Sequence, residues 1–231
     1  MKPRSHPLRI VPVSNSIHPD AGLVSADRGS APRSATGNPL LPANALVRQA
    51  TADDAAALAD LAAATFPLAC PPVMTEDDIN GYIAEHLTEV RFGSYITTAE
   101  RTVLVLEVSN VDAGDAPAAG TGGRLVGYSM LIHTPPLDVE VQAALTLRPT
   151  SMLSKFYIRA DAHGSGLSHR LMDATLSAAA ENGSRAVWLS VSEENVRAQK
   201  FYAKNGFRTV GGMNFPTGRL ILRDFVLERA V

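Results

Sequence analysis

The chain contains a single cysteine, Cys70, in 231 residues, so it cannot form an internal disulfide and suits a reducing compartment. Neither sign of charge dominates: 23 acidic residues nearly balance 21 basic ones, which leaves no basic field for nucleic acid. No apolar run approaches the length of a membrane span, and the N-terminus lacks the hydrophobic segment of a signal peptide. We therefore expect a cytoplasmic protein that partners neither nucleic acid nor membrane.

Metal-ligand spacing is also lacking. The histidines are scattered, and His163 and His169, which flank one glycine-rich turn, have no cysteine or carboxylate nearby to complete a ligand set. The sequence therefore predicts no metal site. Cys70 has no visible histidine and aspartate partners, so we expect a small buried side chain there and not a nucleophile.

Composition divides the chain into two parts. Residues 1–44 are rich in Pro, Ser, Gly, Asn and Arg and show no sustained periodicity, which predicts a disordered or loosely held extension. A substrate-gating arm is the functional alternative for this segment. Residues 45–231 alternate between strand-like and helix-like patterns, which indicates one α/β domain.

The periodicity predicts individual elements in residues 45–231. We expect strands at 46–50, 102–108, 124–132, 153–158, 186–191 and 219–227, and helices at 51–65, 75–87, 167–181 and 195–205. The segments 109–123, 135–149 and 211–218 are expected to be loops. Thr51 and Thr75 each precede acidic residues, which is typical of helix N-caps.

The most informative stretch is the turn His163-Gly164-Ser165-Gly166-Leu167-Ser168, which follows the strand-like residues Tyr157 and Ile158 and opens a helix. Glycines let a backbone approach a ligand without a side chain in the way. The first N–H groups of the following helix lack intrahelical partners and lie at the positive end of its dipole. The turn is therefore predicted to bind a phosphate or pyrophosphate. The alternative is a tight turn whose glycines serve compactness alone.

The spacing of residues in this turn does not match three known loop motifs. The turn has no lysine for a P-loop, and His169 stands where a dinucleotide fingerprint needs its third glycine. Neither Ser165 nor Ser168 is flanked by the two glycines of a hydrolase nucleophile elbow. A nucleotide-binding protein is accordingly disfavoured.

The segment from Phe156 to Met172 resembles the acyl-CoA-binding motif of the GNAT superfamily of N-acetyltransferases, Arg/Gln-x-x-Gly-x-Gly/Ala after a strand. A second segment, Asn195-x2-Ala198-x2-Phe201-Tyr202-x3-Gly206-Phe207, is similar to the asparagine-and-tyrosine helix of that family. Both segments agree in order and spacing, and a looser likeness runs from Leu46 to the C-terminus. Three positions depart from the pattern: His163 replaces Arg or Gln, Ser168 replaces the final Gly or Ala, and Ala160 replaces a frequent proline.

The resemblance implies a GNAT-like α/β fold, with a mixed, twisted sheet of six or seven strands and helices on both faces. It implies transfer of an acetyl group from acetyl-CoA to an amine of a small molecule or a protein. The cofactor-binding residues would be Tyr157, Ile158, His163, Gly164, Ser165, Gly166, Leu167, Ser168 and Asn195. The catalytic residue would be Tyr202, which points its hydroxyl at the thioester sulfur, while Phe201 is expected to be the better core residue. A homodimer is left open.

The acceptor side is less readable. In the resembling family the segment after the first strand shapes the acceptor site, so Phe66, Cys70, Tyr82 and Tyr95 are expected either to line it or to belong to the core. No general base is assigned, because Met152 stands where the family often has a glutamate, and Glu107, Glu193 and Glu194 show no distinguishing feature. The alternative to an enzyme is a GNAT-like module that binds CoA as a sensor without turnover.

Overall fold

The computed structural model describes residues 44–70, 74–109, 123–217 and 220–231. Their strands form one sheet in the order β1-β2-β3-β4-β5-β7-β6. The strands are β1 (Ala45–Gln49), β2 (Arg101–Val108), β3 (Arg124–Ile132), β4 (Thr150–Ile158), β5 (Ala186–Ser192), β6 (Arg208–Thr217) and β7 (Leu220–Ala230). The helices are α1 (Ala55–Thr65), α2 (Glu76–His86), α3 (Glu89–Thr97), α4 (Val139–Ala144), α5 (Leu167–Glu181) and α6 (Val196–Lys204).

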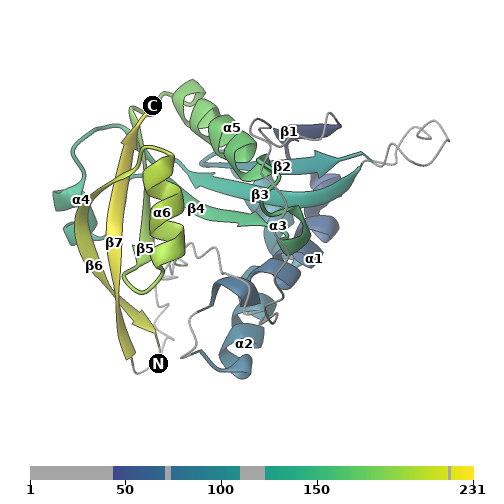
Figure 1. Ribbon diagram of the computed structural model, residues 1–231, viewed down its shortest axis with the longest axis horizontal. Coiled ribbons are helices and arrows are strands. Elements are labelled where there is room, and N and C mark those ends of the chain that lie inside the picture. The colour runs from purple at the N-terminus through teal and green to yellow at the C-terminus, as the bar shows by residue number, and fades with distance from the viewer. Residues whose placement is uncertain (1–43, 71–73, 110–122, 218–219) are drawn as a thin grey trace, which may run out of the picture.

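The sheet splits in the middle. All neighbouring strands are antiparallel except β4 and β5, which run parallel and pair only from Thr150–Ala186 to Met152–Trp188. Beyond that point β4 stays with β3 while β5 stays with β7, so the two halves of the sheet diverge (Figure 1). The predicted mixed α/β sheet is confirmed, and the split gives it two separate inner edges.

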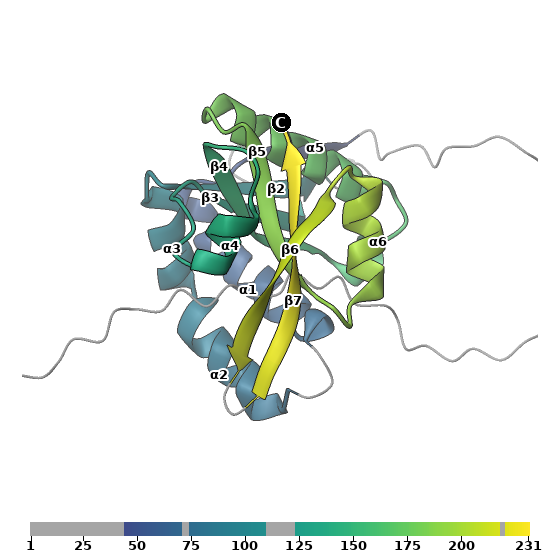
Figure 2. The ribbon, with the colours of Figure 1, turned by 90° about the vertical axis from the view of Figure 1, so that its left-hand side faces the viewer.

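Helices cover both faces of the sheet, as predicted. One face packs against α5 and α6 and includes Phe156, Leu171 and Tyr202. We call this the α5/α6 face. The opposite face packs against α1 and α3 and includes Phe92, Tyr128 and Tyr157. We call this the α1/α3 face. Figure 2 shows α5 and α6 on one side of the strands and α1, α2 and α3 on the other.

The predicted helices form with the expected ends. The hydroxyl of Thr75 accepts a hydrogen bond from the N–H of Asp78, whose carboxylate accepts one from the N–H of Thr75, so a capping box starts α2. In the short turn just before α1, the Asp54 carboxylate likewise accepts a hydrogen bond from the N–H of Thr51. These local signals are carried by residues a few positions apart, which is why the sequence shows them.

Three elements differ from the expectation. The prediction of a loop at 211–218 is wrong, because β6 runs through Gly211 and Gly212 and pairs with β7. A Cβ on Gly211 would lie 2.6 Å from the Cβ of Ala144, so the glycine lets α4 approach the strand. The helices α3 and α4 were not foreseen, and α4 interrupts the expected connection 135–149.

Two further expectations concern residues outside those described. The predicted extension at 1–44 and the predicted loop at 109–123 lie almost wholly in the ranges that the structure does not describe. In the described ranges, no helix combines the length and apolar character needed to cross a bilayer. The same ranges contain no group of three His, Cys, Asp or Glu side chains arranged for a metal ion.

Candidate active site

The free edge of β4 begins the site. Arg159 donates its N–H to the carbonyl of Val126 at 2.8 Å, and Gly127 pairs with Ile158 in the antiparallel ladder. Because successive residues in such a ladder turn their backbone groups to opposite sides, the N–H and C=O of Ile158 face away from β3. They face the side on which β5 has diverged, and because His163 hydrogen-bonds the carbonyl of Ile158, this edge of β4 offers the N–H of Ile158 to a ligand.

Gly127 explains how β3 and β4 come together here. A Cβ at this position would lie 2.4 Å from Cδ1 of Ile158 and 3.0 Å from the carbonyl oxygen of Tyr157. Only glycine leaves room for both without a shift of the strand. The end of β4 is therefore held by close packing against β3, independently of any ligand.

The turn after β4 is held open by its own side chains. Ser165 Oγ donates to the carbonyl of Ala162 at 2.6 Å, and His163 Nε2 donates to the carbonyl of Ile158 at 3.1 Å. Gly164 and Gly166 adopt φ values of +75° and +81°, which are left-handed. Such turns direct successive N–H groups into one concavity.

The N–H groups of this turn are available for an anion. Among the described residues, those of Gly164, Ser165, Gly166 and Ser168 have no hydrogen-bond acceptor. Leu167 begins α5, so the positive end of the helix dipole lies at the same place. Open space surrounds the position of a Cβ on Gly164, as a phosphate would require. The structure thus brings residues 157–158 and 163–168 together, as the sequence predicts. Within the described residues, the N–H groups named above remain free as donors and are not used up inside the turn.

Asn195 and Tyr202 lie at the two ends of α6. Asn195 is the N-cap, and its Oδ1 accepts the N–H of Ala198 at 2.9 Å, which leaves its amide nitrogen for another contact. Tyr202 is 0% exposed, and its hydroxyl has no partner among the described residues. Burial raises its pKa, so the phenol stays protonated at neutral pH. Phe201 is only half-buried, so the expectation that it is the better core residue of the two is wrong.

The α1/α3 face carries the predicted acceptor-side aromatics. Phe66 and Tyr82 stack with ring centroids 4.6 Å apart, and Tyr128 and Tyr157 stack at 5.4 Å. Cys70 is buried, its thiol contacts the carbonyl of Phe66, and burial raises its pKa to about 12. Phe66 and Cys70 are therefore core residues, whereas the half-buried Tyr82 lies between the core and the surface.

Two cations share this aromatic face. Lys155 on β4 is 4% exposed, and among the described residues its ammonium has only the ring of Tyr82, 6.0 Å away. Arg101 on β2 lies over the ring of Tyr95 at 4.7 Å. Burial and the nearby charge of Arg101 lower the pKa of Lys155 to about 8. The sequence reasoning passed over Lys155, although a lysine in an otherwise apolar central strand was a signal.

The carboxylates of Glu107, Glu193 and Glu194 are not placed to act as a general base. Glu107 is bound by Arg48, with Nε and Oε2 2.9 Å apart, and Glu193 lies 3.6 Å from Nε of Arg223. Glu194 is exposed. A different carboxylate, Asp224 on β7, is 1% exposed and has no hydrogen bond from a described residue. Burial raises its pKa to about 6.

Comparisons with known proteins agree with this geometry. The model of the acetyltransferase (GNAT) family matches residues 82–207, from α2 to the end of the α6 region. The chain belongs to the GNAT family. It is therefore an acetyltransferase, as the resemblance in the sequence implied, and its split sheet and donor-lined turn are the parts of a GNAT domain described above.

Named relatives are close in sequence. Uncharacterized N-acetyltransferases of Mycobacterium tuberculosis and Mycobacterium bovis are 38% identical over 176 residues, which cover 76% of this chain and 97% of theirs. The match therefore covers nearly the whole length of these relatives and about three quarters of this chain.

Solved structures share the fold at lower identity. A PaiA N-acetyltransferase from Thermoplasma acidophilum, solved in complex with coenzyme A, matches with a TM-score of 0.57 and 17% identity, covering 81% of this chain and 99% of that one. An N-acetyltransferase from Staphylococcus aureus matches with a TM-score of 0.52 and 17% identity, covering 81% and 99%. These likenesses support the GNAT fold of the sheet and its helices.

Proposed function

We propose that the protein transfers an acetyl group from acetyl-CoA to a primary amine of a small molecule or a peptide. The observation that carries this proposal is the set of N–H groups at Gly164, Ser165, Gly166 and Ser168, which have no acceptor among the described residues and lie next to the free edge of β4. A pyrophosphate fits the first and an extended pantetheine arm fits the second, since an extended chain adds to a strand edge through backbone hydrogen bonds.

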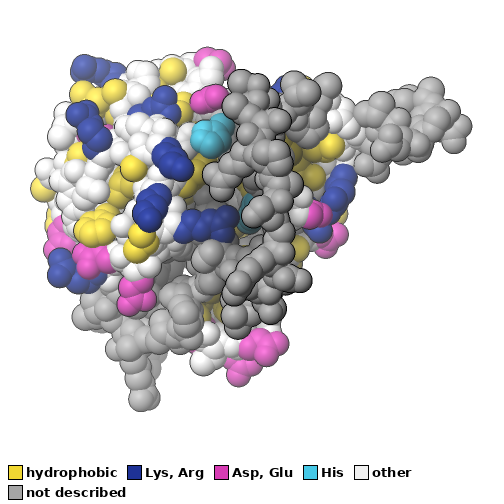
Figure 3. Space-filling view, viewed as in Figure 1, with side chains coloured by type: hydrophobic (Ala, Val, Ile, Leu, Met, Phe, Trp, Pro, Cys, Tyr) yellow, Lys and Arg dark blue, Asp and Glu magenta, His cyan; other side chains and the backbone are white. Residues whose placement is uncertain are grey.

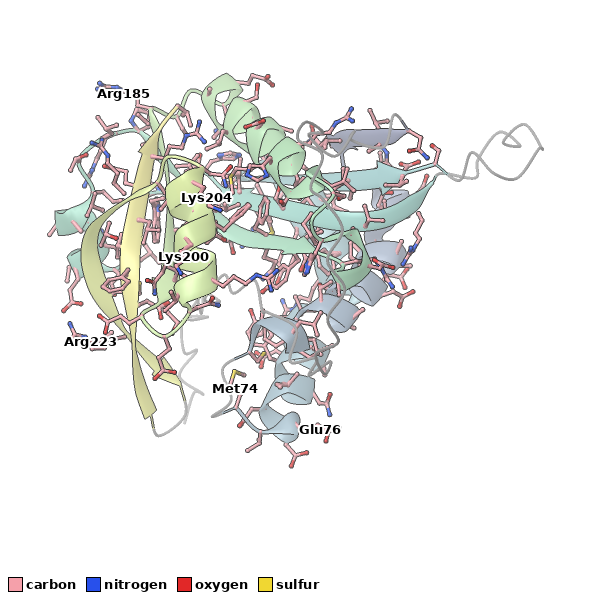
Figure 4. All side chains as sticks on the ribbon, in the orientation of Figure 1. Met74, Glu76, Arg185, Lys200, Lys204 and Arg223 are labelled. Atoms are coloured by element: carbon pink, nitrogen blue, oxygen red, sulfur yellow. The ribbon has the colours of Figure 1, made fainter. Side chains whose placement is uncertain are left out.

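Cations on α6, a helix that contacts the first turn of α5, support the same donor. The ring of His169 in the first turn of α5 contacts the ring of Phe201 on α6, with centroids 5.8 Å apart. The exposed Lys200 and Lys204 lie one turn apart on α6 (Figure 4). Lys and Arg side chains gather over α6 and the strands behind it (Figure 3). Such a surface favours a ligand that carries several phosphates.

The proposed chemistry uses two groups of this chain. The N–H of Ile158 faces the free edge and is suited to polarise the acetyl carbonyl, because a fixed donor stabilises the negative charge that develops on that oxygen. The Tyr202 hydroxyl stays protonated and has no competing partner among the described residues, so it is suited to protonate the sulfur as the C–S bond breaks.

A matched pair of glycine variants tests the donor site. Gly164 and Gly183 both have positive φ, +75° and +83°, and a Cβ on either meets no protein atom within 4 Å. Gly164→Ala and Gly183→Ala should therefore each cost a similar ~1 kcal/mol of stability. Only Gly164→Ala should weaken acetyl-CoA binding, by about tenfold or more, because its methyl group meets the phosphate.

Calorimetry with acetyl-CoA checks this pair, with ATP as a second ligand. Equal loss of affinity in both variants would contradict the phosphate assignment, and tighter binding of ATP would favour a nucleotide site. Release of CoA is then measured against primary alkyl amines, aminoglycosides and peptide N-termini. Binding of acetyl-CoA without CoA release from any of these amines would favour a sensor module.

A further inference from the structure

Two buried carboxylates on β7 face the same side of the sheet and differ in their contacts. Glu228 accepts the N–H groups of Thr146 and Leu147 at 3.0 and 3.1 Å, and the Thr146 hydroxyl also donates to it. Asp224, four residues earlier, accepts no hydrogen bond of ordinary geometry from a described residue, although it is 1% exposed. Burying a carboxylate without partners costs free energy, so Asp224 needs an explanation that Glu228 does not.

The neighbours of Asp224 are also without partners. In the register of β5 and β7, Trp188 pairs with Glu228 and Ser190 pairs with Val226. Directly paired residues turn their side chains to the same face, here the face that holds Tyr157. The Ser190 hydroxyl and the Trp188 indole N–H are buried, and neither makes a hydrogen bond of ordinary geometry to a described residue, although the Ser190 hydroxyl is near enough to Asp224 to lower its pKa. A polar group of three side chains therefore lies within the α1/α3 face.

This group lies where the sheet splits. The last pair of β4 and β5 is Met152–Trp188, and four residues further the diverged strands have reached Phe156 and Ser192. Asp224 lies directly across from Ser192. The free edge at Ile158 is only two residues beyond Phe156. Asp224 is thus one strand removed from the opening between β4 and β5, across β5 from the β4 edge that carries the proposed carbonyl site.

Electrostatics around Asp224 favour a proton or a cation. Burial, partly offset by the nearby Ser190 hydroxyl, and the charge of Glu193 together raise the pKa of Asp224 to about 6. Glu228 is the other acid on this face of β7, and Met213 flanks Asp224 from β6. A pKa near neutrality suits a general base, which must be ionised at working pH and still bind a proton well.

We propose that Asp224 is the general base of this enzyme, that it takes the proton of an acceptor alkylammonium, and that the Ser190 hydroxyl positions it. This inference rests on the proposed function. The ammonium gives one proton to Asp224 and becomes a neutral amine. Its nitrogen then forms a bond to the acetyl carbon while the C–S bond breaks. As the amide forms, Tyr202 gives its proton to the sulfur and takes the second nitrogen-bound proton, so CoA leaves as a thiol and the phenol is restored. Asp224 finally releases its proton to water.

The test compares Asp224→Asn with Glu228→Gln. Both change a buried carboxylate to an amide on the same strand and face. The substrate is the amine from the panel above that the wild type acetylates fastest. In Asp224→Asn, kcat/KM at pH 7.5 should fall by about 10²–10⁴-fold, and the acidic limb of the pH profile near pH 6 should disappear. Glu228→Gln should retain the wild-type rate per folded molecule and the limb.

Stability separates a base from a structural residue. Asp224→Asn removes an unpartnered charge, so its melting temperature at pH 7.5 should rise, and the difference should vanish below about pH 4, where the wild-type carboxyl is protonated as well. Acetyl-CoA affinity should be unchanged and shows that the variant is folded.

The inference is overturned if Asp224→Asn retains the wild-type rate and acidic limb. It is also overturned if the rate falls together with the melting temperature while the limb remains. Absence of turnover in the wild type would overturn the proposed function first, and the base with it.

Discussion

The two faces of the sheet satisfy their buried polar groups to different degrees. On the α5/α6 face, Ser129 and Thr175 bond each other at 2.7 Å, and the Tyr202 hydroxyl is the one side-chain group of the described core there that lacks a partner. On the α1/α3 face, Tyr128, Trp188, Ser190 and Asp224 all have polar atoms without partners among the described residues. Lys155 adds an ammonium that, among the described residues, has only the ring of Tyr82 beside it, 6.0 Å from the ring centroid.

This difference indicates that the two faces of the sheet have different roles. The α5/α6 face supports the turn at 163–168, whose proposed ligand contacts come from the backbone, so the side chains of this face are free to pack as an ordinary core. The α1/α3 face retains buried donors, acceptors and charges that packing alone would not favour. Proteins keep such groups where a ligand uses them, at a cost in stability. We therefore expect variants on the two faces to separate stability from activity.

The largest effect on stability is expected at Lys155, which sharpens the comparison. Burial lowers its pKa from 10.5 to about 8, so the folded state holds this proton less tightly than the unfolded state. Wild-type stability should therefore rise as pH increases from about 8 to about 10.5. Lys155→Met keeps the apolar stem and removes the charge, and should add up to about 3 kcal/mol to the free energy of unfolding at pH 7.

Urea unfolding at pH 7 and pH 10 measures this effect. The gain in Lys155→Met should shrink at the higher pH, because the wild-type ammonium is then mostly neutral. Lys204→Met, at an exposed site on α6, is the control and should change stability little at either pH. A loss of stability in Lys155→Met at pH 7 would show that the ammonium is well solvated or paired.

The next effect is expected at Tyr202, whose hydroxyl is the one unpartnered side-chain group that the described residues show on the α5/α6 face. Tyr202→Phe keeps the ring contacts with Phe201 and Phe207 and removes only the hydroxyl. Turnover should fall by about 10²-fold, at the lower end for a general acid, because a thiolate leaves fairly easily without help. Acetyl-CoA affinity and the melting temperature should hardly change.

The turnover of Tyr202→Phe and wild type can be compared in this way only if the chemical step limits the rate. Single-turnover kinetics with excess enzyme provide that check, and Phe201→Leu tests whether ring packing alone affects the rate. Wild-type turnover in Tyr202→Phe under these conditions would remove the acid role. The α5/α6 face would then serve packing and donor binding alone.

What the sequence could predict follows the same division. The turn at 163–168, the caps at Thr51 and Thr75, and the strands on either side of α5 depend on residues close together in the chain, and all formed as expected. The strand β6 was missed because its two glycines are typical of a loop, and only its pairing with β7 and the contact with α4 reveal the strand.

Asp224 was missed for a related reason. It lies in an alternating strand next to Arg223, where an acidic residue would ordinarily face water, and nothing local marks it as buried. Its burial and its lack of partners come from β5, β6 and the elements packed over them. A sequence motif reflects contacts within one segment, whereas an acceptor site is assembled from segments far apart in the chain. A single sequence does not show which of those segments become neighbours.

The smallest effect is expected at His163, which joins the turn to the strand edge. Its Nε2–H donates to the carbonyl of Ile158, so it holds one backbone group of the edge while leaving the N–H for the ligand. His163→Ala should lower acetyl-CoA affinity about two- to tenfold, the value of one hydrogen bond. His163→Gln should recover most of it, because the glutamine amide also donates.

Calorimetry on the two variants decides between two roles of this histidine. If His163 acted as a cation on the phosphates, neutral glutamine would not recover the affinity, and the loss in His163→Ala would depend on salt. If it acts through Ile158, recovery is independent of salt, and the turnover of His163→Ala falls along with binding because the carbonyl site loses its alignment. The second pattern would link the donor turn of the α5/α6 face to the reacting carbonyl on β4, and would show that the two faces meet at that one backbone edge.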